Sequence, residues 1–504
     1  MKTIRGSRLL KKAAIWLAVT ATVVVTAAAG AATWLYTSAD VSTVGKASFD
    51  NRLAIPPLAG SRVEKDGTRV FDLRMQSGAT EFRPGQQTPT WGFNGAYLGP
   101  TLRAERGEKV RVDIRNTLDE PSTVHWHGMH LPARMDGGPH QMIDPGGSWS
   151  PRWTVDQPAA TLWYHPHPHG QTEEHVQRGL AGMFILDDDK AAGLDLPAEY
   201  GVNDVPVIVQ DTQFDGDRFD HGHRIMENTG FLGDRTMVNG TLTPYHRVGD
   251  ELVRLRLLNA STARVYNFGF ADDRSFSLIG TDGGLLEAPY ATDRLKLSPG
   301  ERAEIVVRAE PGERVMLRGY PVGDGDFWNQ RFSGGDDSFD VLQLRAADTL
   351  RPSAALPARL VAPETPDGSD AVRDRHFDLR MSGINGEPMR MDRIDATVTR
   401  GTTEVWTVRN EDGMPHNFHV HDVQFRVLEV NGEQPPPPLR GPKDTVYVPS
   451  GTTMRLALRF DGPADPDVPY MYHCHLLYHE DGGMMGQFVV VEPGQRAGAV
   501  RGGH

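Results

Sequence analysis

The chain has 504 residues and a formal net charge of -13, from 53 Lys and Arg against 66 Asp and Glu. This length suffices for about three or four domains, and the acidic balance argues against a nucleic-acid-binding protein, which needs a basic face. The single cysteine excludes an internal disulfide framework and any CxxC zinc or redox motif. The 54 Gly and 36 Pro favour many short strands and turns. The unusual feature is the presence of 19 histidines beside one thiol.

The first 45 residues predict an export signal peptide or an N-terminal membrane anchor. A basic flank without acidic residues precedes an uncharged stretch at residues 13–36; the basic residues are Lys2, Arg5, Arg8, Lys11 and Lys12. The positive-inside rule keeps this flank in the cytoplasm. The uncharged stretch exceeds the usual signal-peptide core of about 7–15 residues and is close to the roughly 20 that span a bilayer, while residues 27–29 are small enough for cleavage. In either case the body is exported, secreted or anchored to the outer face of the plasma membrane.

After residue 50 the sequence predicts an all-β fold of repeated β-sandwiches. Short runs of alternating apolar residues have the period of half-buried strands; they span residues 109–116, 204–211, 252–259, 303–310, 403–410, 454–460 and 486–492. A turn of Gly followed by an acidic residue recurs before several of them, which indicates a repeated domain plan. We expect three units at residues 50–195, 196–350 and 370–493, with a Pro- and Ala-rich linker at 351–369.

Ten of the histidines fall in four short clusters in the first and third units. The clusters are His125-Trp126-His127, His165-Pro166-His167, His416 with His419 and His421, and His473-Cys474-His475 with His479. Successive side chains on a strand point to opposite faces, so extended backbone puts the Cys474 sulfur opposite its two flanking imidazoles. The same rule separates His416 from the other two members of its cluster. Two kinds of site follow: one from His416, Cys474 and His479, and another from eight same-face imidazoles.

The ligand types indicate copper. A His2Cys set with a weak axial Met is typical of a blue-copper electron-transfer site. Met484 follows His479 after a Gly-containing turn and is the candidate axial ligand, with Met485 as its neighbouring competitor. Because a structural zinc needs only four ligands, eight imidazoles in one place favour a cluster of copper ions.

The clusters lie in longer motifs that resemble all four copper motifs of the multicopper oxidases, a family that includes laccases. The motifs are HWHG at 125–128, WYHPHPHG at 163–170, HNFHVH at 416–421 and HCHLLYHEDGGMM at 473–485. MDGGP at 135–139 and DQPAATLWYHPHPHG at 156–170 most resemble the bacterial copper-tolerance cuprous oxidases. The resemblance implies three consecutive cupredoxin-like Greek-key sandwiches and four copper ions: one type 1, one type 2 and two type 3.

The resemblance also assigns each ligand to a copper. Type 1 copper would take His416, Cys474 and His479 with axial Met484; type 2 would take His125 and His419; one type 3 would take His127, His165 and His475, and the other His167, His421 and His473. The implied reaction couples four one-electron oxidations of a donor to reduction of one dioxygen to two waters. Cys474 would accept each electron and pass it along the backbone to its two flanking histidines, about 6.6 Å apart in a strand.

Four further residues take roles by resemblance. Asp136 in MDGGP matches an acid near the type 2 copper, and Glu480 matches an acid on the oxygen-side path, so we expect both to supply protons. Asp412 and Met414 match positions that help to bind a substrate cuprous ion in the cuprous oxidases, and Met is a suitable soft ligand.

The electron donor stays open between two classes. Cuprous oxidases carry a Met-rich segment over the type 1 site, but here no Met lies between Met316 and Met381. We therefore place laccase-like oxidation of phenolic or aromatic donors first and cuprous-ion oxidation for copper tolerance second. A copper nitrite reductase or a non-enzymatic copper-binding scaffold fits less well, because all ten family histidines and the cysteine are present.

The remaining candidates have supporting roles. We expect Trp126 and Trp163 to pack around the cluster, and four nearby histidines to be outer-shell or surface residues: His130, His140, His169 and His175. The middle unit has no matched ligand, although it contains His221, His223 and His246. We expect it to space the outer units, whose interface would hold the cluster.

Overall fold

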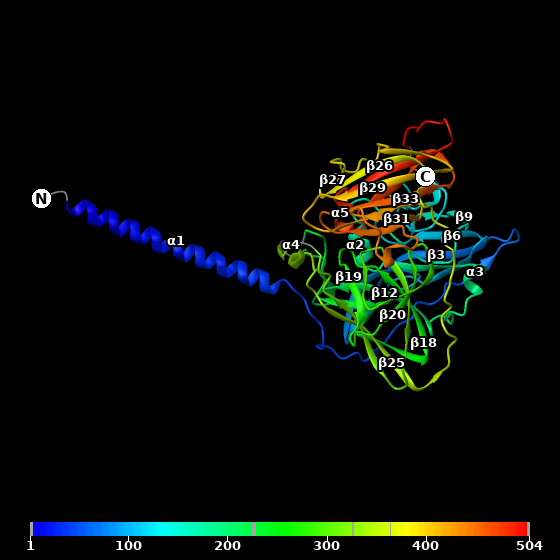
Figure 1. Cartoon of the computed structure of the whole chain (residues 1–504), viewed down its shortest axis with the longest axis horizontal. Coiled ribbons are helices and arrows are strands. Elements are labelled where there is room, and N and C mark those ends of the chain that lie inside the picture. Colours follow the sequence, from blue (N-terminus) through cyan, green and yellow to red (C-terminus); the bar gives the residue numbers. More distant parts are fainter. Residues whose placement is uncertain (1–3, 224–227, 325–326, 363, 501–504) are drawn as a thin grey trace. The chain divides into compact units, whose positions relative to one another are not determined.

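The computed structural model describes residues 4–500 except 224–227, 325–326 and 363 (Figure 1). The chain separates into two compact units, one ending at Val41 and one starting at Ser42. The first unit consists mainly of helix α1 (Ile4–Ser38), whose segment Lys11–Ser38 is long and apolar enough to cross a membrane, a property that signal sequences share. Lys2 of the basic flank lies outside the described residues.

The first β-sandwich packs a six-stranded sheet against a four-stranded one. The larger sheet contains β2 (Ser61–Val63), β3 (Arg69–Arg83), β4 (Gln86–Phe93), β6 (Lys109–Asn116), β8 (Ser148–Trp149) and β9 (Arg152–Thr154). The smaller contains β5 (Leu102–Glu105), β7 (His125–His127), β10 (Ala160–His165) and β11 (Gly182–Asp187). Leu73 and Val112 from one sheet and Phe184 from the other lie in one buried core. Three short helices follow strands of this sandwich: η1 (Ala133–Met135), α2 (Thr172–Gln177) and α3 (Asp189–Ala192).

The middle sandwich has a seven-stranded and a six-stranded sheet. The seven-stranded sheet contains β12 (Asp204–Thr212), β15 (Arg235–Val238), β16 (Thr241–Leu242), β18 (Leu252–Asn259), β20 (Phe276–Thr281), β21 (Gly284–Thr292) and β23 (Arg302–Arg308). The other contains β1 (Asn51–Arg52), β17 (Pro244–Asp250), β19 (Tyr266–Phe270), β22 (Leu295–Leu297), β24 (Arg314–Tyr320) and β25 (Phe339–Arg351). A hairpin of β13 (Phe214–Asp215) and β14 (Arg218–Phe219) and the helix α4 (Phe327–Phe332) complete it. Although β1 precedes the first sandwich in sequence, it pairs with β17 at the edge of the middle one.

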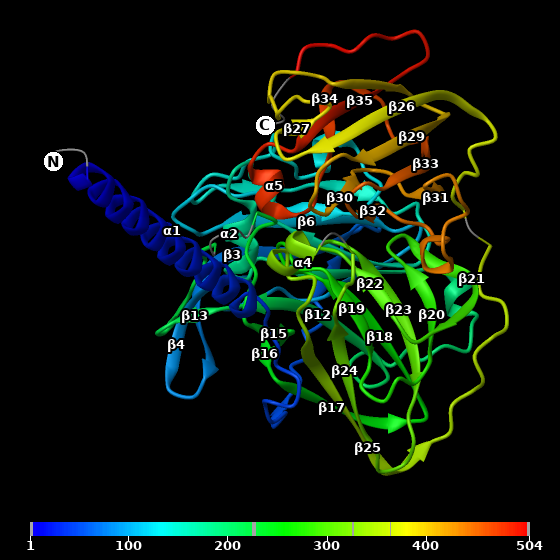
Figure 2. The ribbon, with the colours of Figure 1, turned by 60° about the vertical axis from the view of Figure 1, so that its left-hand side comes forward.

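The third sandwich has two five-stranded sheets around a core that includes Trp406, Phe418 and Cys474. One sheet contains β26 (Ala371–Arg380), β27 (Gly383–Ile384), β29 (Thr402–Asn410), β31 (Phe425–Val430) and β33 (Thr453–Phe460). The other contains β28 (Ala396–Thr399), β30 (His416–Val420), β32 (Thr445–Val448), β34 (Asp465–His473) and β35 (Met485–Val491). The short helices are η2 (Pro437–Leu439) and α5 (Leu477–Asp481). Figure 2 shows α5 beside α2 of the first sandwich, a contact that brings the two outer sandwiches together.

The strand predictions from alternation are confirmed. The seven predicted runs coincide within two residues with β6, β12, β18, β23, β29, β33 and β35. In β6, Val110, Val112 and Ile114 are buried between partly or fully exposed charged neighbours, as the period of two requires. We keep the domain boundaries near residues 195 and 350 as a proposal; the chain changes sheets between β11 and β12 and again between β25 and β26.

A buried ion network joins the first and middle sandwiches. Arg256 on β18 donates to Asp204 at 2.7 and 2.9 Å and to Glu304 at 2.9 Å. It also donates to the hydroxyl of Thr161 on β10 at 2.8 Å. Burial raises the pKa of Glu304, but Arg254 and Arg256 outweigh this effect and bring it to about 2. These charges are compensated, and they hold the two sandwiches in a defined position.

Candidate metal centre

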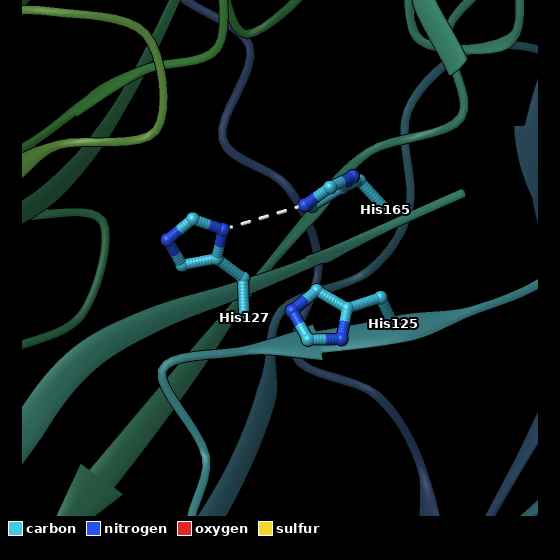
Figure 3. A group of neighbouring side chains, drawn as sticks. All are labelled: His125, His127 and His165. Carbon is cyan, nitrogen blue, oxygen red and sulfur yellow. Dashed lines mark hydrogen bonds between the residues drawn. The ribbon is translucent and has the colours of Figure 1, made fainter. Parts of the chain in front are cut away.

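Two pairs of neighbouring strands carry most of the eight same-face imidazoles. In the first sandwich β7 pairs with β10, and His125 lies opposite His165. In the third, β30 pairs with β34, and His419 lies opposite His473. Figure 3 shows the imidazoles of His125 and His127, both from β7, converging with that of His165. The structure thus brings the predicted clusters of both outer sandwiches to one place.

Three members of the group lie just beyond a strand end. β10 ends at His165, β30 at Val420 and β34 at His473, so His167, His421 and His475 are outside the strands. Their imidazoles nevertheless reach the group. The Nε2 atoms of His167 and His473 are 3.1 Å apart, and those of His475 and His165 are 3.4 Å apart. All eight side chains are buried.

An oxygen atom orients most of these imidazoles through one ring nitrogen. The Nδ1 atoms of four of them contact backbone carbonyls: His125 with Asp136 at 3.0 Å, His165 with Pro166 at 2.8 Å, His419 with Asp444 at 2.9 Å and His473 with Cys474 at 3.1 Å. His127 has the reverse orientation, with Nε2 3.0 Å from Asp444 Oδ1 and Nδ1 3.4 Å from His165 Nε2. When an oxygen accepts the proton of one ring nitrogen, the other nitrogen keeps a lone pair for a metal.

The inward nitrogens suit copper. The Nε2 atoms of His125 and His419 are buried without a hydrogen-bond partner. Three sets of three ring nitrogens lie within 4.8 Å of one another: His125, His127 and His165; His125, His419 and His421; and His167, His421 and His473. Burial lowers the pKa of several imidazoles well below its usual value; they are His127, His165, His419 and His421. Neutral imidazoles of this kind are ligands that copper favours, so the residues fit the predicted cluster.

The thiol site is separate from this group. Cys474 Sγ lies 3.7 Å from His416 Nδ1 and 3.6 Å from His479 Nδ1, and the two nitrogens are 3.1 Å apart. All three side chains are buried. Burial raises the pKa of the Cys474 thiol to about 12, so a thiolate here needs a cation beside it, and a coordinated metal deprotonates a thiol.

The two competing methionines pack differently. Met484 lies in the buried cluster that contains Cys474 and Leu476, whereas Met485 packs with Met389 and Met471. Both are fully buried. This difference favours Met484 as the thioether for the thiol site.

A short segment connects the two groups. Cys474 is bonded on either side to a histidine of the eight-imidazole group, so no residue intervenes between the sulfur ligand and either neighbour. Asn417 braces this segment, because its Oδ1 accepts a bond from His475 N at 2.5 Å and lies 3.6 Å from Cys474 Sγ. Its Nδ2 donates to Pro299 O of the middle sandwich at 2.9 Å.

Both predicted acids contact imidazoles of the group. Asp136 Oδ2 accepts a bond from His421 Nδ1 at 2.7 Å. Glu480 lies between two rings, 3.1 Å from His473 Nδ1 and 3.4 Å from His167 Nδ1. Although burial raises the pKa of Glu480, the imidazoles hold it well below its usual value. Each carboxylate therefore lies within hydrogen-bonding reach of an imidazole of the group.

The outer side of the thiol site carries the predicted substrate residues. Asp412 Oδ2 lies 2.8 Å from His416 Nε2 and accepts a bond from the Met381 backbone nitrogen at 2.6 Å. The bond with His416 lowers the pKa of Asp412. The Asp412 side chain is 25% exposed and Met381 is 42% exposed, with Met414 half-buried in the same loop as Asp412. Sequence reasoning did not place Met381 here, because nothing in its spacing relates it to Asp412.

The two tryptophans have different roles. Trp163 stacks on His165 with ring centroids 4.0 Å apart, as we expected. Trp126 instead packs in the core of the first sandwich with Trp153 and Phe184. The prediction for Trp126 is wrong, because it alternates with His125 and His127 on β7 and so faces the other side of the sheet.

The other histidines named from sequence lie outside the candidate metal groups found among the described residues. His175 Nδ1 bonds the hydroxyl of Ser122 at 3.0 Å, and His140 bonds Gln487. Sequence reasoning missed Asp444 and Arg302, which contact each other beside His127. Their signal is weak because each directly precedes or begins an apolar strand, where a charged residue ordinarily faces solvent.

The protein combines three β-sandwiches with two groups of metal-binding side chains, the His2Cys site and the eight imidazoles. One peptide segment joins the two groups. This arrangement defines a copper protein with more than one metal centre. Comparison with known proteins agrees. Three models described as "Multicopper oxidase" match residues 74–191, 200–317 and 361–494. The chain belongs to the multicopper oxidase family, which implies that it binds copper and acts as an oxidoreductase.

Its relatives carry two kinds of name. "Multicopper oxidase mco" of Staphylococcus haemolyticus is 35% identical over 87% of this chain and 92% of its own length. "Cell division protein FtsP" of Escherichia coli is 37% identical over 87% of this chain and 92% of its own length. Among solved structures, a laccase from Pediococcus acidilactici has a TM-score of 0.80 at 34% identity, covering 88% of this chain and 94% of its own.

A laccase-like multicopper oxidase CueO from Ochrobactrum sp. has a TM-score of 0.79 at 36% identity, covering 87% of this chain and all of its own. It is described as having oxidase activity towards lignin model compounds and lignosulfonate. These neighbours confirm the predicted fold class of three cupredoxin-like domains.

Proposed function

We propose that this protein is a laccase-like oxidase that couples four one-electron oxidations of phenolic or aromatic donors, or of metal ions, to reduction of one dioxygen to two waters. One observation carries the proposal. The single thiol, held against two imidazoles, is bonded through the backbone to two imidazoles of the eight-membered group. A site that collects single electrons is thereby joined to one that can hold several metal ions.

We assign the ligands as the family motifs do. His416, Cys474, His479 and Met484 would hold the type 1 copper; His125 and His419 the type 2 copper; and His127, His165 and His475, with His167, His421 and His473, the type 3 pair. When bound, the four copper ions supply one-electron redox chemistry and the reduction of dioxygen. Glu480 and Asp136, which contact the imidazoles, would pass protons to the group, where oxygen reduction consumes them.

An organic donor is favoured by exposed aromatic surface beside the type 1 site. Tyr478, next to the ligand His479, is 39% exposed, and Trp328 on α4 is 38% exposed. Helix α4 reaches the same region, because Asn329 donates to Gly413 O in the loop of Asp412 at 2.8 Å. Flat aromatic donors stack on such side chains. The Ochrobactrum relative, described as acting on lignin model compounds, supports this class.

Cuprous-ion oxidation is the second candidate, and the contact of Met381 with Asp412 favours it. The chain lacks a Met-rich segment between Met316 and Met381. Met381, whose side chain is exposed, bonds Asp412 through its backbone nitrogen, and Asp412 in turn contacts His416. A carboxylate and nearby methionine residues suit a soft monovalent copper substrate.

A third role, as a scaffold without oxygen chemistry, is raised by the relatives named cell division proteins. The complete ligand set of this chain argues against it. Oxygen uptake by the copper-loaded protein separates the alternatives, because a scaffold binds copper without turnover.

The test compares steady-state oxidation of a bulky phenol and of cuprous ion by one copper-loaded preparation, then by Met414→Leu and Met381→Leu. An organic oxidase is blue and consumes oxygen with the phenol, and both variants keep that activity. A cuprous oxidase loses cuprous turnover in the variants and keeps phenol turnover. A copper-loaded protein that lacks the blue absorption, or that is inert to every donor, contradicts the proposed function.

We also propose that α1 is either a cleaved signal or a retained anchor that places the body outside the cytoplasm. Its apolar segment supports both outcomes. N-terminal sequencing of the protein from the membrane and soluble fractions of the producing cell decides between them.

A further inference from the structure

The middle sandwich provides no ligand in our assignment, but its Arg302 side chain lies at the edge of the imidazole group. Arg302 begins β23 and is fully buried. Its guanidinium donates to Asp444 through two bonds, Nη1 to Oδ1 at 2.7 Å and Nη2 to Oδ2 at 2.6 Å. This is the bidentate geometry that binds a carboxylate most rigidly. Asp444 is also fully buried, so the two opposite charges compensate each other away from the protein surface.

The remaining donors of Arg302 reach the other sandwiches. Nε donates to Thr161 O of the first sandwich at 3.0 Å. Nη1 and Nη2 donate to Gly300 O and Asp282 O of the middle sandwich, each at 3.0 Å. Because Asp444 belongs to the third sandwich, one guanidinium with five satisfied N–H groups joins all three.

The carboxylate of Asp444 in turn orients imidazoles. Asp444 Oδ1 lies 3.0 Å from His127 Nε2 and 3.6 Å from His419 Nδ1, whose closer partner is the Asp444 carbonyl at 2.9 Å. Thr445 Oγ1 adds a contact of 3.0 Å to the same His127 nitrogen. The contact at Nε2 accounts for the reversed orientation of His127, because a proton on Nε2 would be shared with these oxygens and would leave a lone pair on Nδ1 facing His165.

The surrounding backbone is shaped for this pair. Gly128, which follows His127, has φ +86°, and a Cβ there would lie 2.5 Å from Asp444 Oδ2 and 2.7 Å from Arg302 Nη2. Gly300 has φ +84°, and a Cβ there would lie 3.1 Å from both His127 and His475. Two glycines thus leave room for the ion pair and for the rings that it orients.

We infer that Arg302 and Asp444 are a positioning pair that sets the orientation of His127 and His419 and thereby the copper affinity of the eight-imidazole group. The middle sandwich is then part of the metal centre and not only a spacer. This inference rests on the proposed function in one respect, namely that the group binds copper. It adds which residues outside the ligand set control that binding.

The test measures cluster-copper affinity by chelator competition in the full-length, copper-loaded protein and in Arg302→Lys and Asp444→Asn. Lys keeps the positive charge of Arg302 but cannot make two parallel bonds to the carboxylate. Asn keeps the shape of the Asp444 side chain but removes its negative charge. Loss of such outer partners typically weakens metal binding about 10–100-fold. We expect this loss for the type 2 and type 3 copper, with a changed electron paramagnetic resonance signal of the type 2 copper and an unchanged blue absorption at Cys474.

Arg256→Lys is the matched control. Arg256 is a buried arginine that joins the first and middle sandwiches through Asp204, Glu304 and Thr161, but none of these three contacts is to a copper ligand. It should lower the thermal midpoint while leaving cluster-copper affinity within about twofold of the wild type. If Arg302→Lys and Asp444→Asn do not fold, Thr445→Val is used in their place, because it removes only a hydroxyl. It should lower the affinity for cluster copper several-fold.

The inference is overturned if Arg302→Lys and Asp444→Asn, or Thr445→Val in their place, bind cluster copper as tightly as Arg256→Lys does. Failure of the proposed function looks different, because the wild type itself would then lack the blue absorption, the cluster copper or oxygen uptake.

Discussion

Substituting Gly128 by Ala gives a stability change that can be worked from two separate effects. Gly128 has φ +86°, a left-handed conformation that costs a residue with a side chain about 1–2 kcal/mol. Its new Cβ would also lie 2.5 Å from Asp444 Oδ2, 2.7 Å from Arg302 Nη2 and 2.9 Å from Leu162 Cδ2. These neighbours are buried and bonded on several sides, so overpacking adds about 1–3 kcal/mol. The total loss should be about 2–5 kcal/mol.

Gly170 provides a matched control within the next copper motif. It has the same φ of +86°, but no atom lies within 4 Å of the position of its Cβ. Gly170→Ala should therefore cost only the backbone strain of about 1–2 kcal/mol. The difference between the two variants measures the contact of the new Cβ with Asp444, Arg302 and Leu162.

The assay compares thermal midpoints of the copper-loaded variants at one scan rate, together with their cluster-copper content. For domains of this size each kcal/mol moves the midpoint by about 2–4 °C, so Gly128→Ala should unfold several degrees below Gly170→Ala and hold cluster copper less tightly. Equal midpoints and equal copper content would refute the steric reasoning, because they would mean that the pair moves aside freely.

Four further predictions follow from the site and the ion networks. Cys474→Ser should abolish the blue absorption and donor oxidation but keep the fold, which absorption and circular dichroism spectra check. Met484→Leu should shift the type 1 potential while Met485→Leu leaves it unchanged, and both should cost less than about 1.5 kcal/mol; equal potentials would exclude Met484 as axial ligand. Chelation of copper should lower the thermal midpoint, since a ligand that binds only the folded state stabilises it. Glu304 has a pKa of about 2 in the folded protein against 4.5 in the unfolded chain. Its contribution to the free energy of unfolding, up to about 3 kcal/mol, is therefore present above pH 4.5 and lost as the pH falls towards 2. The urea midpoint of Glu304→Gln should vary less with pH over that range than the midpoint of the wild type.

The sequence predicts those features that depend on one strand at a time. Apolar alternation located β6 and β18 to the residue, and the same period separated Cys474 from its flanking histidines. The prediction for Trp126 was wrong because this rule was not applied to it: a residue between two ligands on a strand must face the opposite side of the sheet. The alternation of side chains along a strand therefore predicted the copper ligands as well as the positions of the strands.

Contacts between distant segments could not be predicted in this way. Arg302 and Asp444 are 142 residues apart, and no periodicity relates a strand of the middle sandwich to one of the third. The same holds for Met381 and Asp412, because their contact depends on the parallel pairing of β26 and β29, in which Leu379 lies opposite Asn410. In each case the side chain alone resembles a solvated residue, and only the partner across the fold gives it a role.

The placement of the ligands explains why a sandwich without ligands is needed. Four of the eight imidazoles come from the first sandwich and four from the third, so the spacing of the metal centre depends on how two separate bodies dock. Direct contact through α2 and α5 fixes one side of that docking. On the other side the middle sandwich bonds both partners, to Thr161 and to Asp444, through a single guanidinium with a fixed fork. A rigid third body that binds both ligand-bearing bodies beside the rings sets their separation more tightly than a flexible linker can, because a linker limits only the maximum distance.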